Sequence, residues 1–166
     1  MSFDAFDRSF TRWMARHGIL ALRLSLGVVF IWFGVLKFFP GMSPAQELAE
    51  NTLAVLTGGR VPARVAILGL AGWETAIGLG LTLGVFLRAT LFLLWLQMAG
   101  ALMPLVLFPS LVFHHFPYAP TMEGQYIIKN LVLIAAGIVI GATVRGGRLS
   151  AEEPAAGRAG AGARIA

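Results

Sequence analysis

One carboxylate, Glu74, lies within a long apolar stretch of the sequence, and other polar side chains lie in three further apolar stretches. We expect Glu74 to be the centre of a ligand-binding site whose other members are Lys129, Lys37, Arg23, Gln97, Asn130 and Tyr126. Lysine, amide and phenol groups can donate hydrogen bonds to a carbonyl, and a carboxylate can exchange a proton. The sequence shows no nucleophile–base arrangement, so the catalytic residues are unknown and it stays open whether this protein is an enzyme.

The depth of Glu74 indicates which cation it meets. It lies ten residues into its apolar segment, or ~15 Å along a helix, which is close to the middle of a bilayer. An unpaired carboxylate there costs at least about 2.5 kcal/mol, so it must be protonated, hydrated or paired. From depth alone we expect Glu74–Lys129 to be the main pair, with Lys37 nearby. Arg23 is expected in the opposite half of the membrane, where it anchors its helix or meets Gln97.

A polar cluster of this kind has two interpretations. Three cations, one acid and two amides are more than the register of a small helix bundle requires, which favours a functional site. The same cluster can also serve only to fix how the helices pack. Taken one at a time, Arg23 and Lys37 also fit long cationic side chains that anchor helix ends at the membrane surface. Both interpretations stay open at the level of the sequence.

Several other kinds of site are excluded by residue type. The chain has no cysteine, which excludes disulfides, thiol redox chemistry, iron–sulfur clusters and cysteine-ligated zinc. Any redox role must therefore use an external cofactor. No covalently bound group is implied, and a quinone is the candidate. His114 and His115 are adjacent, so their side chains point apart, and we expect no metal site.

The elements that must position these residues are membrane-spanning helices. Of the 166 residues, 57% are hydrophobic and 13% are charged, and the mean hydropathy is +0.78, which is typical of a membrane protein. Long apolar stretches predict four spans, at about 19–39, 64–84, 89–112 and 125–144. We therefore expect an all-α fold, an integral membrane four-helix bundle over residues 19–145, with a kink near Pro104.

The segments around these spans carry different patterns. Residues 1–18 predict an amphipathic interfacial helix ending at Gly18, because aromatic and arginine side chains occupy different faces. Between the first two spans, Ser43–Gln46 fits a capping box that starts a short surface helix, and this helix is expected to reach Leu56. Residues 146–166 lack periodicity and predict a disordered cytoplasmic tail.

Small residues predict where the helices pack closely. In the first span, Gly27 and Gly34 lie on the same helical face as Arg23 and Lys37, and that face is expected to look into the protein. Two more faces allow close approach of a neighbouring helix. They consist of Gly72, Ala76, Gly80 and Gly84 in the second span and of Gly137 and Gly141 in the fourth.

Arginine is distributed unevenly between the two sides of the predicted bundle. Four spans place both termini on one side, which holds Arg8, Arg12, Arg16, Arg88, Arg145, Arg148, Arg158 and Arg164. The other side holds little beyond Arg60 and Arg64. This asymmetry predicts a multi-pass protein with both termini in the cytoplasm. The net charge of +5 then reflects orientation and contact with the lipid bilayer, and no nucleic-acid partner is expected.

Three stretches carry a family resemblance: RLSLGVVFIWFGVLKFFP, WETAIGL and IIKNLVLIAAG. Over about residues 19–145 the chain resembles DoxX-like integral membrane proteins, most closely their YkgB/RclC-type branch, which is linked with reactive chlorine resistance. The resemblance implies a four-helix protein of the bacterial inner membrane, and polar residues of the family match Arg23, Lys37, Glu74 and Lys129. Where the branch often has an aspartate this chain has Asn130, which removes a second acid, and the loop after the first span is shorter than in the branch.

The resemblance implies a membrane subunit of a quinone-linked redox or oxidative-stress-defence system. Its partners would be redox or stress-response proteins, and a homo-oligomer stays open. Two other functions remain. A non-catalytic scaffold or assembly partner needs only the small-residue faces and the basic interfacial helix. A small proton-linked transporter could be built around Glu74, although small four-helix exporters usually carry their acid in the first helix.

Overall fold

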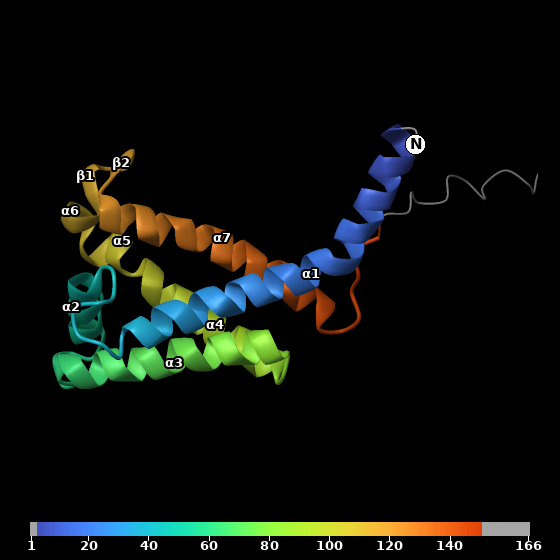
Figure 1. Ribbon diagram of the computed structural model, residues 1–166. Helices are drawn as coiled ribbons and strands as arrows, with labels where there is room; N and C mark the ends of the chain where they lie inside the picture. The colour runs from blue at the N-terminus through green and yellow to red at the C-terminus, as the bar shows by residue number, and fades with distance from the viewer. Residues whose placement is uncertain (1–2, 151–166) are drawn as a thin grey trace, which may run out of the picture.

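The computed structural model describes residues 3–150 (Figure 1). Its main elements are four helices that are long and apolar enough to cross a membrane. They are α1 (Phe3–Leu36), α3 (Ala63–Leu83), α7 (Met122–Thr143) and the stretch Leu87–Leu107, which joins α4 (Leu87–Leu102) to α5 (Pro104–Leu107). Helix α1 packs mainly on α3, and α4 packs on both α3 and α7. The predicted all-α bundle of four apolar helices is confirmed.

The two ends of the bundle differ in construction. One end, which we call the α2 end, holds α2 (Gln46–Leu56), α5, α6 (Pro109–Val112) and a hairpin of β1 (Phe113–His115) and β2 (Ala119–Pro120) (Figure 1). The other end, which we call the terminal end, holds the start of α1 and the end of α7. An even number of spans brings both ends of the described chain to the same side, as the sequence predicts.

Helix α1 passes through Gly18 without a break, so the predicted end of a separate helix at that residue is wrong. A glycine inside a helix costs only about 1 kcal/mol relative to alanine, and no proline follows to stop the helix. The first turns project beyond the bundle (Figure 1). Their aromatic side chains are exposed and stack on one another, with ring centroids 6.1 Å apart for Phe6–Phe10 and 6.0 Å for Phe10–Trp13. The aromatic stripe is therefore present as part of α1.

The third span is shorter than the predicted 89–112, because two prolines interrupt it. Proline lacks the backbone N–H that an interior helix position donates, and its ring clashes with the preceding turn. Helix α4 ends at Leu102, before Pro104. Phe108 then leaves the helical region, with φ −135° and ψ 54°, before Pro109 starts α6. The predicted kink near Pro104 is confirmed, whereas a continuous helix to residue 112 is wrong.

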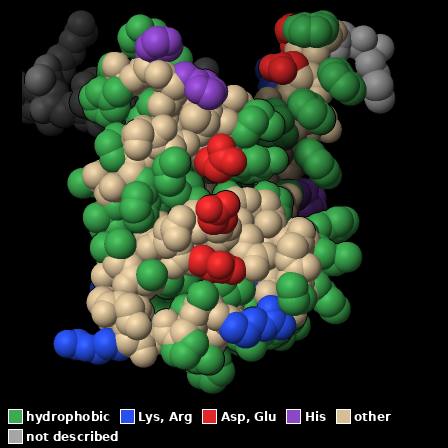
Figure 2. Space-filling model, turned by 90° about the vertical axis from the view of Figure 1, so that its left-hand side faces the viewer, with side chains coloured by type: hydrophobic (Ala, Val, Ile, Leu, Met, Phe, Trp, Pro, Cys, Tyr) green, Lys and Arg blue, Asp and Glu red, His purple; other side chains and the backbone are tan. Residues whose placement is uncertain are grey.

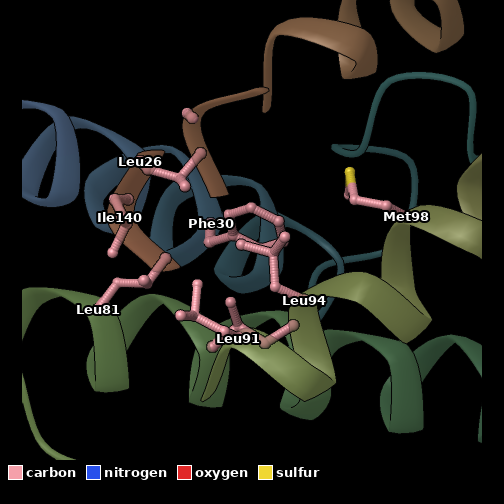
Figure 3. Packing of buried hydrophobic residues seen from close by; sticks show 9 residues of the cluster. Leu26, Phe30, Leu81, Leu91, Leu94, Met98 and Ile140 are labelled. Atoms are coloured by element: carbon pink, nitrogen blue, oxygen red, sulfur yellow. The ribbon is translucent and has the colours of Figure 1, made fainter. Parts of the chain in front are cut away.

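Aliphatic and aromatic side chains from all four spans meet in the core. Figure 3 shows Leu26 and Phe30 of α1 together with Leu81, Leu91, Leu94 and Ile140, all of them buried. Met98, from a later turn of α4, belongs to the same buried cluster. A second, smaller buried cluster of Leu48, Val112 and Ile127 lies toward the α2 end.

Glycines on α1 set its distance from α3. A Cβ atom on Gly34 would lie 2.8 Å from the Thr75 backbone nitrogen, and one on Gly27 would lie 3.0 Å from the Gly78 carbonyl oxygen. The predicted inward face of α1 is confirmed, since Gly27, Phe30 and Gly34 are all buried. The small-residue face of α7 is also confirmed, because Gly137 and Gly141 face leucines of α4.

The predicted small-residue face of α3 is realised only in part. Gly80 packs against Thr90 of α4, and Gly84 packs against Arg23. Gly72 and Ala76 instead lie on an exposed side of α3, and no atom lies within 4 Å of the place where a Gly72 Cβ would be. A four-residue repeat drifts around a helix of 3.6 residues per turn, so its two ends face different neighbours.

Helix α2 starts without the predicted capping box. Its N-cap is Ala45, in the left-handed region at φ 52°, and no side chain caps it. The Ser43 hydroxyl donates to the Pro44 carbonyl, and Oε1 of Gln46 accepts from the Gly41 backbone N–H. The left-handed turn at Ala45 moves Ser43 away from the amides that it would have capped. The helix does end at Leu56, as predicted, and Thr57 is its C-cap.

Two further segments lie outside the apolar helices. The link around His114 and His115 forms a short antiparallel hairpin in which Phe113 pairs with Pro120. Of the predicted tail over 146–166, only residues 146–150 are described, and they form no helix or strand. Residues 151–166 lie outside the described part of the chain.

Candidate functional site

The carboxylate of Glu74 has a hydrogen-bond donor on each oxygen. Nζ of Lys37 lies 2.7 Å from Oε2, and Nε2 of Gln97 donates to Oε1 over 2.9 Å. Only 12% of the Lys37 side chain and 11% of the Glu74 side chain are exposed. A buried carboxylate is tolerated when a counter-charge and further hydrogen bonds replace water, and this arrangement supplies both.

Helix α1 delivers Lys37 to this place. The lysine follows Leu36, the last residue of α1, and Nζ also donates to the Phe33 carbonyl over 3.4 Å. A cation is favourable there, because the last carbonyls of a helix carry partial negative charge. Gly34, one turn earlier, lets α1 approach α3 so closely that its Cβ would lie 3.1 Å from Cβ of Glu74. The short lysine–carboxylate distance thus depends on a glycine.

The predicted main pair, Glu74–Lys129, is wrong. Lys129 is exposed, and its Nζ lies over the ring of Tyr126, 5.5 Å from the centroid. The prediction used depth alone, and depth does not distinguish the two lysines on the α2 side of Glu74. The pair is decided by which helix touches α3, and that helix is α1. The expectation that Lys37 lies near Glu74 is confirmed.

A cavity of about 470 Å³ lies between α7 and the Lys37–Glu74 pair. Lys129 lines this cavity and therefore belongs to the same site. The volume of the cavity is in the range of small-molecule sites. Six of the seven candidate residues line it: Glu74, Lys37, Gln97, Lys129, Asn130 and Tyr126. Sequence reasoning missed Thr52 of α2 and Glu123 of α7, which also line it. Both belong to short polar stretches outside the apolar runs, so hydropathy gave no signal for them.

Apolar side chains form most of the cavity wall. Helix α2 places Leu48, Leu53 and Leu56 between the cavity and the α2 end of the bundle. Phe30 and Met98, which both belong to the buried core cluster, also line the cavity. The polar groups are therefore few and lie within an apolar shell, which is the usual construction of a site for a largely apolar ligand.

The cavity is also open sideways, between α1 and α7. Phe33 of α1 and Tyr126 of α7 line it, yet these side chains are 37% and 46% exposed on the side of the bundle. Figure 1 shows α1 and α7 crossing near the terminal end and separating toward the α2 end. In a multi-pass membrane protein this side of the bundle meets lipid. A lipophilic molecule could reach the cavity from the bilayer.

Arg23 lies outside this site. Its guanidinium packs against Gly84, where a Cβ would lie 2.6 Å from Nη1, and Gly84 has the positive φ of 71° that favours glycine. Arg23 therefore meets the end of α3 and not Gln97, whose amide is bonded to Glu74. Among residues 3–150 its buried Nε has no hydrogen-bond partner. The prediction that Arg23 lies in the opposite half of the bundle from Lys37 is confirmed, and the half that holds Arg23 is the one near the terminal end.

The α2 end of the bundle is rich in acidic residues. Figure 2 looks onto this end and shows acidic side chains near the middle of the face, with Lys or Arg side chains below them and hydrophobic or uncharged groups around them. Glu47 and Glu50 of α2 and Glu123 in the first turn of α7 belong to this end. Glu50 accepts a hydrogen bond from Gln46 over 2.7 Å. The cavity thus lies beneath an acidic surface.

Two groups that could do chemistry lie away from the cavity. His114 and His115 are exposed on β1, and the His115 ring stacks on Tyr118 with centroids 6.1 Å apart. Within residues 3–150 no three His, Asp or Glu side chains are grouped as a metal site would need. The cavity with its Lys37–Glu74–Gln97 group is therefore the candidate functional site. Neither a family model, nor a curated protein, nor a solved structure matches this chain.

Proposed function

We propose that this protein is a DoxX-like inner-membrane protein that binds a quinone in the cavity between α1, α2, α3, α4 and α7. In this proposal it is a membrane subunit of a quinone-linked redox or oxidative-stress-defence system. One observation carries the proposal: a buried Lys37–Glu74–Gln97 group lies inside an apolar cavity that opens sideways between α1 and α7. The family resemblance over residues 19–145 points the same way.

The donors around the cavity suit a ligand with two carbonyl groups. Lys37, just after the end of α1, and Gln97 of α4 lie on one side, and Lys129, Asn130 and Tyr126 lie on α7. A quinone ring between these helices would accept hydrogen bonds at its two ends. Its apolar tail would leave between α1 and α7, where the cavity is open.

Glu74 has a place in such a reaction. Reduction of a quinone to a quinol takes up two electrons and two protons. Lys37 and Glu74 are hydrogen-bonded to each other and both line the cavity, so this pair would donate one of these protons to a ligand carbonyl. The electrons would come from a redox partner protein, because the chain has no cysteine for thiol or iron–sulfur chemistry.

Binding of a short-tailed quinone to the purified protein in detergent tests the proposal. We expect saturable binding by titration calorimetry and a rise in the midpoint of thermal unfolding. In the double variant Lys37→Met/Glu74→Gln, the quinone should bind about 10- to 100-fold more weakly, since a charge-assisted hydrogen bond contributes about 1.5–3 kcal/mol. The double variant removes both charges and so avoids a buried unpaired carboxylate.

Arg60→Met is the matched control, because it removes an exposed cation outside the cavity. It should bind the quinone as the unmodified protein does. A folded bundle that binds no quinone would contradict the proposal. So would equal affinity in the double variant and the unmodified protein.

A scaffold function is the second candidate, favoured by the exposed aromatic stripe on the first turns of α1, which we call the α1 arm. Phe3 and Phe6 are 81% and 62% exposed, and the arm projects beyond the bundle (Figure 1). A membrane surface or another protein could cover this stripe. If scaffolding is the whole function, Glu74→Gln should change the abundance or assembly of a complex without loss of a quinone-dependent activity.

A further inference from the structure

A second hollow lies near the terminal end of the bundle, between the start of α4 and the end of α7. Its volume is about 330 Å³, and it shares no lining residue with the first cavity. Seven residues line it: Arg88, Leu91, Phe92, Trp95, Gly141, Val144 and Arg145. We call it the α4–α7 groove.

Two arginines from different helices meet in this groove. Arg88 is the second residue of α4, and Arg145 comes two residues after the end of α7. Both side chains are exposed, and within residues 3–150 neither forms an ion pair or a side-chain hydrogen bond. No carboxylate lines the groove. The arrangement therefore leaves two positive charges without a protein counter-charge at one place.

The first turn of α4 adds to the preference for an anion. The first N–H groups of a helix lack intrahelical acceptors, and the macrodipole makes this end positive. No side chain caps α4, whose N-cap is Phe86. Arg88 stands in that turn. A phosphate in the groove would meet guanidinium groups, which bind it with paired hydrogen bonds.

The rest of the groove is apolar and suits acyl chains. Leu91, Phe92 and Trp95 continue along α4 away from the arginines, and Phe92 is 66% exposed. On α7 the missing side chain of Gly141 leaves the groove hollow, and a Cβ there would lie 3.7 Å from Leu91. A charged head at one end of an apolar groove between spanning helices has the chemistry of an anionic phospholipid.

We propose that the α4–α7 groove binds an anionic phospholipid whose phosphate is held by Arg88 and Arg145. The acyl chains lie along α4, over the exposed Phe92 and Trp95. This site is separate from the quinone cavity, so either site can be present without the other. It places the lipid in the leaflet next to the arginine-rich end of the bundle.

Native mass spectrometry tests this proposal on the full chain, released from micelles that contain equal amounts of phosphatidylglycerol and phosphatidylcholine. We expect the unmodified protein to retain phosphatidylglycerol at least tenfold more than phosphatidylcholine. The variant Arg88→Gln/Arg145→Gln should lose that preference while remaining folded, because both side chains are exposed and unpaired within the described residues.

The matched control is Arg16→Gln/Arg148→Gln, which removes the same charge from exposed positions outside the groove. It should retain phosphatidylglycerol as the unmodified protein does. An equal loss of lipid in the control would show general surface attraction and overturn the site. A protein that retains no phosphatidylglycerol, or that dimerises through this face without lipid, would overturn it too.

Discussion

At the scale of single residues, the site depends on which lysine reaches Glu74. Lys37 and Lys129 both line the cavity, yet only Lys37 bonds to the carboxylate, at 2.7 Å. Lys129 lies over Tyr126 and is exposed. The two lysines therefore differ in role: Lys37 balances the buried charge, and Lys129 is free to meet a ligand at the open side of the cavity.

A double-mutant cycle on Lys37→Met and Glu74→Gln should show this difference. Loss of Lys37 leaves the buried carboxylate without a counter-charge, which costs about 3–5 kcal/mol of unfolding free energy. The double variant should cost less than the sum of the two single variants, with a coupling of about 1 kcal/mol or more. Unfolding by titration with a denaturing detergent in mixed micelles measures these free energies.

The cycle on Lys129→Met and Glu74→Gln is its control. Lys129 makes no hydrogen bond to Glu74, so this coupling should be close to zero. A larger coupling with Lys129 than with Lys37 would contradict the arrangement described above.

At the scale of elements, the site exists because α1 and α3 lie very close together while α1 and α7 separate. Gly34 is the point of closest approach near the site, since its Cβ would meet both Thr75 and Glu74. The separation of α1 from α7 leaves the cavity between them. Helix α2 then covers this space with leucines. Each of these elements touches the cavity, so a shift in one should change binding.

Gly34→Ala should destabilise the protein by about 1–3 kcal/mol, because an overpacked interface must move apart. The added Cβ would lie 2.8 Å from the Thr75 nitrogen, and that nitrogen belongs to the backbone. The same shift would draw Lys37 away from Glu74 and weaken quinone binding. Denaturing-detergent titration and calorimetry measure the two effects.

Gly72→Ala provides the matched control on α3. No atom lies within 4 Å of the new Cβ, so only helix propensity should change, with a gain of up to about 1 kcal/mol. Similar behaviour of the two alanine variants would contradict the proposed role of Gly34 in close packing.

At the scale of the whole molecule, charge divides the two ends of the bundle. The terminal end carries most of the arginines, and the α2 end carries Glu47, Glu50 and Glu123. The larger cavity lies toward the α2 end, and the α4–α7 groove lies near the terminal end. A ligand in the cavity would therefore lie in the half of the membrane farther from the arginines.

Labelling of single cysteines should give the orientation of the bundle. The chain has no cysteine, so Met42→Cys near the α2 end and Arg148→Cys near the terminal end can each be made in a clean background. We expect a membrane-impermeant maleimide to label Met42→Cys in intact spheroplasts, and Arg148→Cys only after lysis. Met42 is 62% exposed, so access does not limit its labelling. The reverse pattern would overturn the predicted cytoplasmic termini.

The sequence by itself determined the elements and the polar residues, because both follow from local patterns. Apolar runs long enough to span a bilayer predict four helices, and the prediction for α3, about 64–84, agrees closely with Ala63–Leu83. Charges and amides inside such runs tend to face the protein interior, so the sequence alone predicts Glu74, Lys37 and Gln97 as members of a polar site. The inward face of α1 follows from helical periodicity in the same way.

Only the tertiary structure decided which of these groups meet. Position along a helix gives the depth of a side chain, whereas pairing depends on which helices touch and on how each is rotated. Lys37 reaches Glu74 because two glycines bring α1 onto α3, and Lys129 does not because a cavity separates α7 from that pair. The cavity itself, with Thr52 and Glu123 in its wall, is produced by helices packing in three dimensions, and no local pattern encodes it.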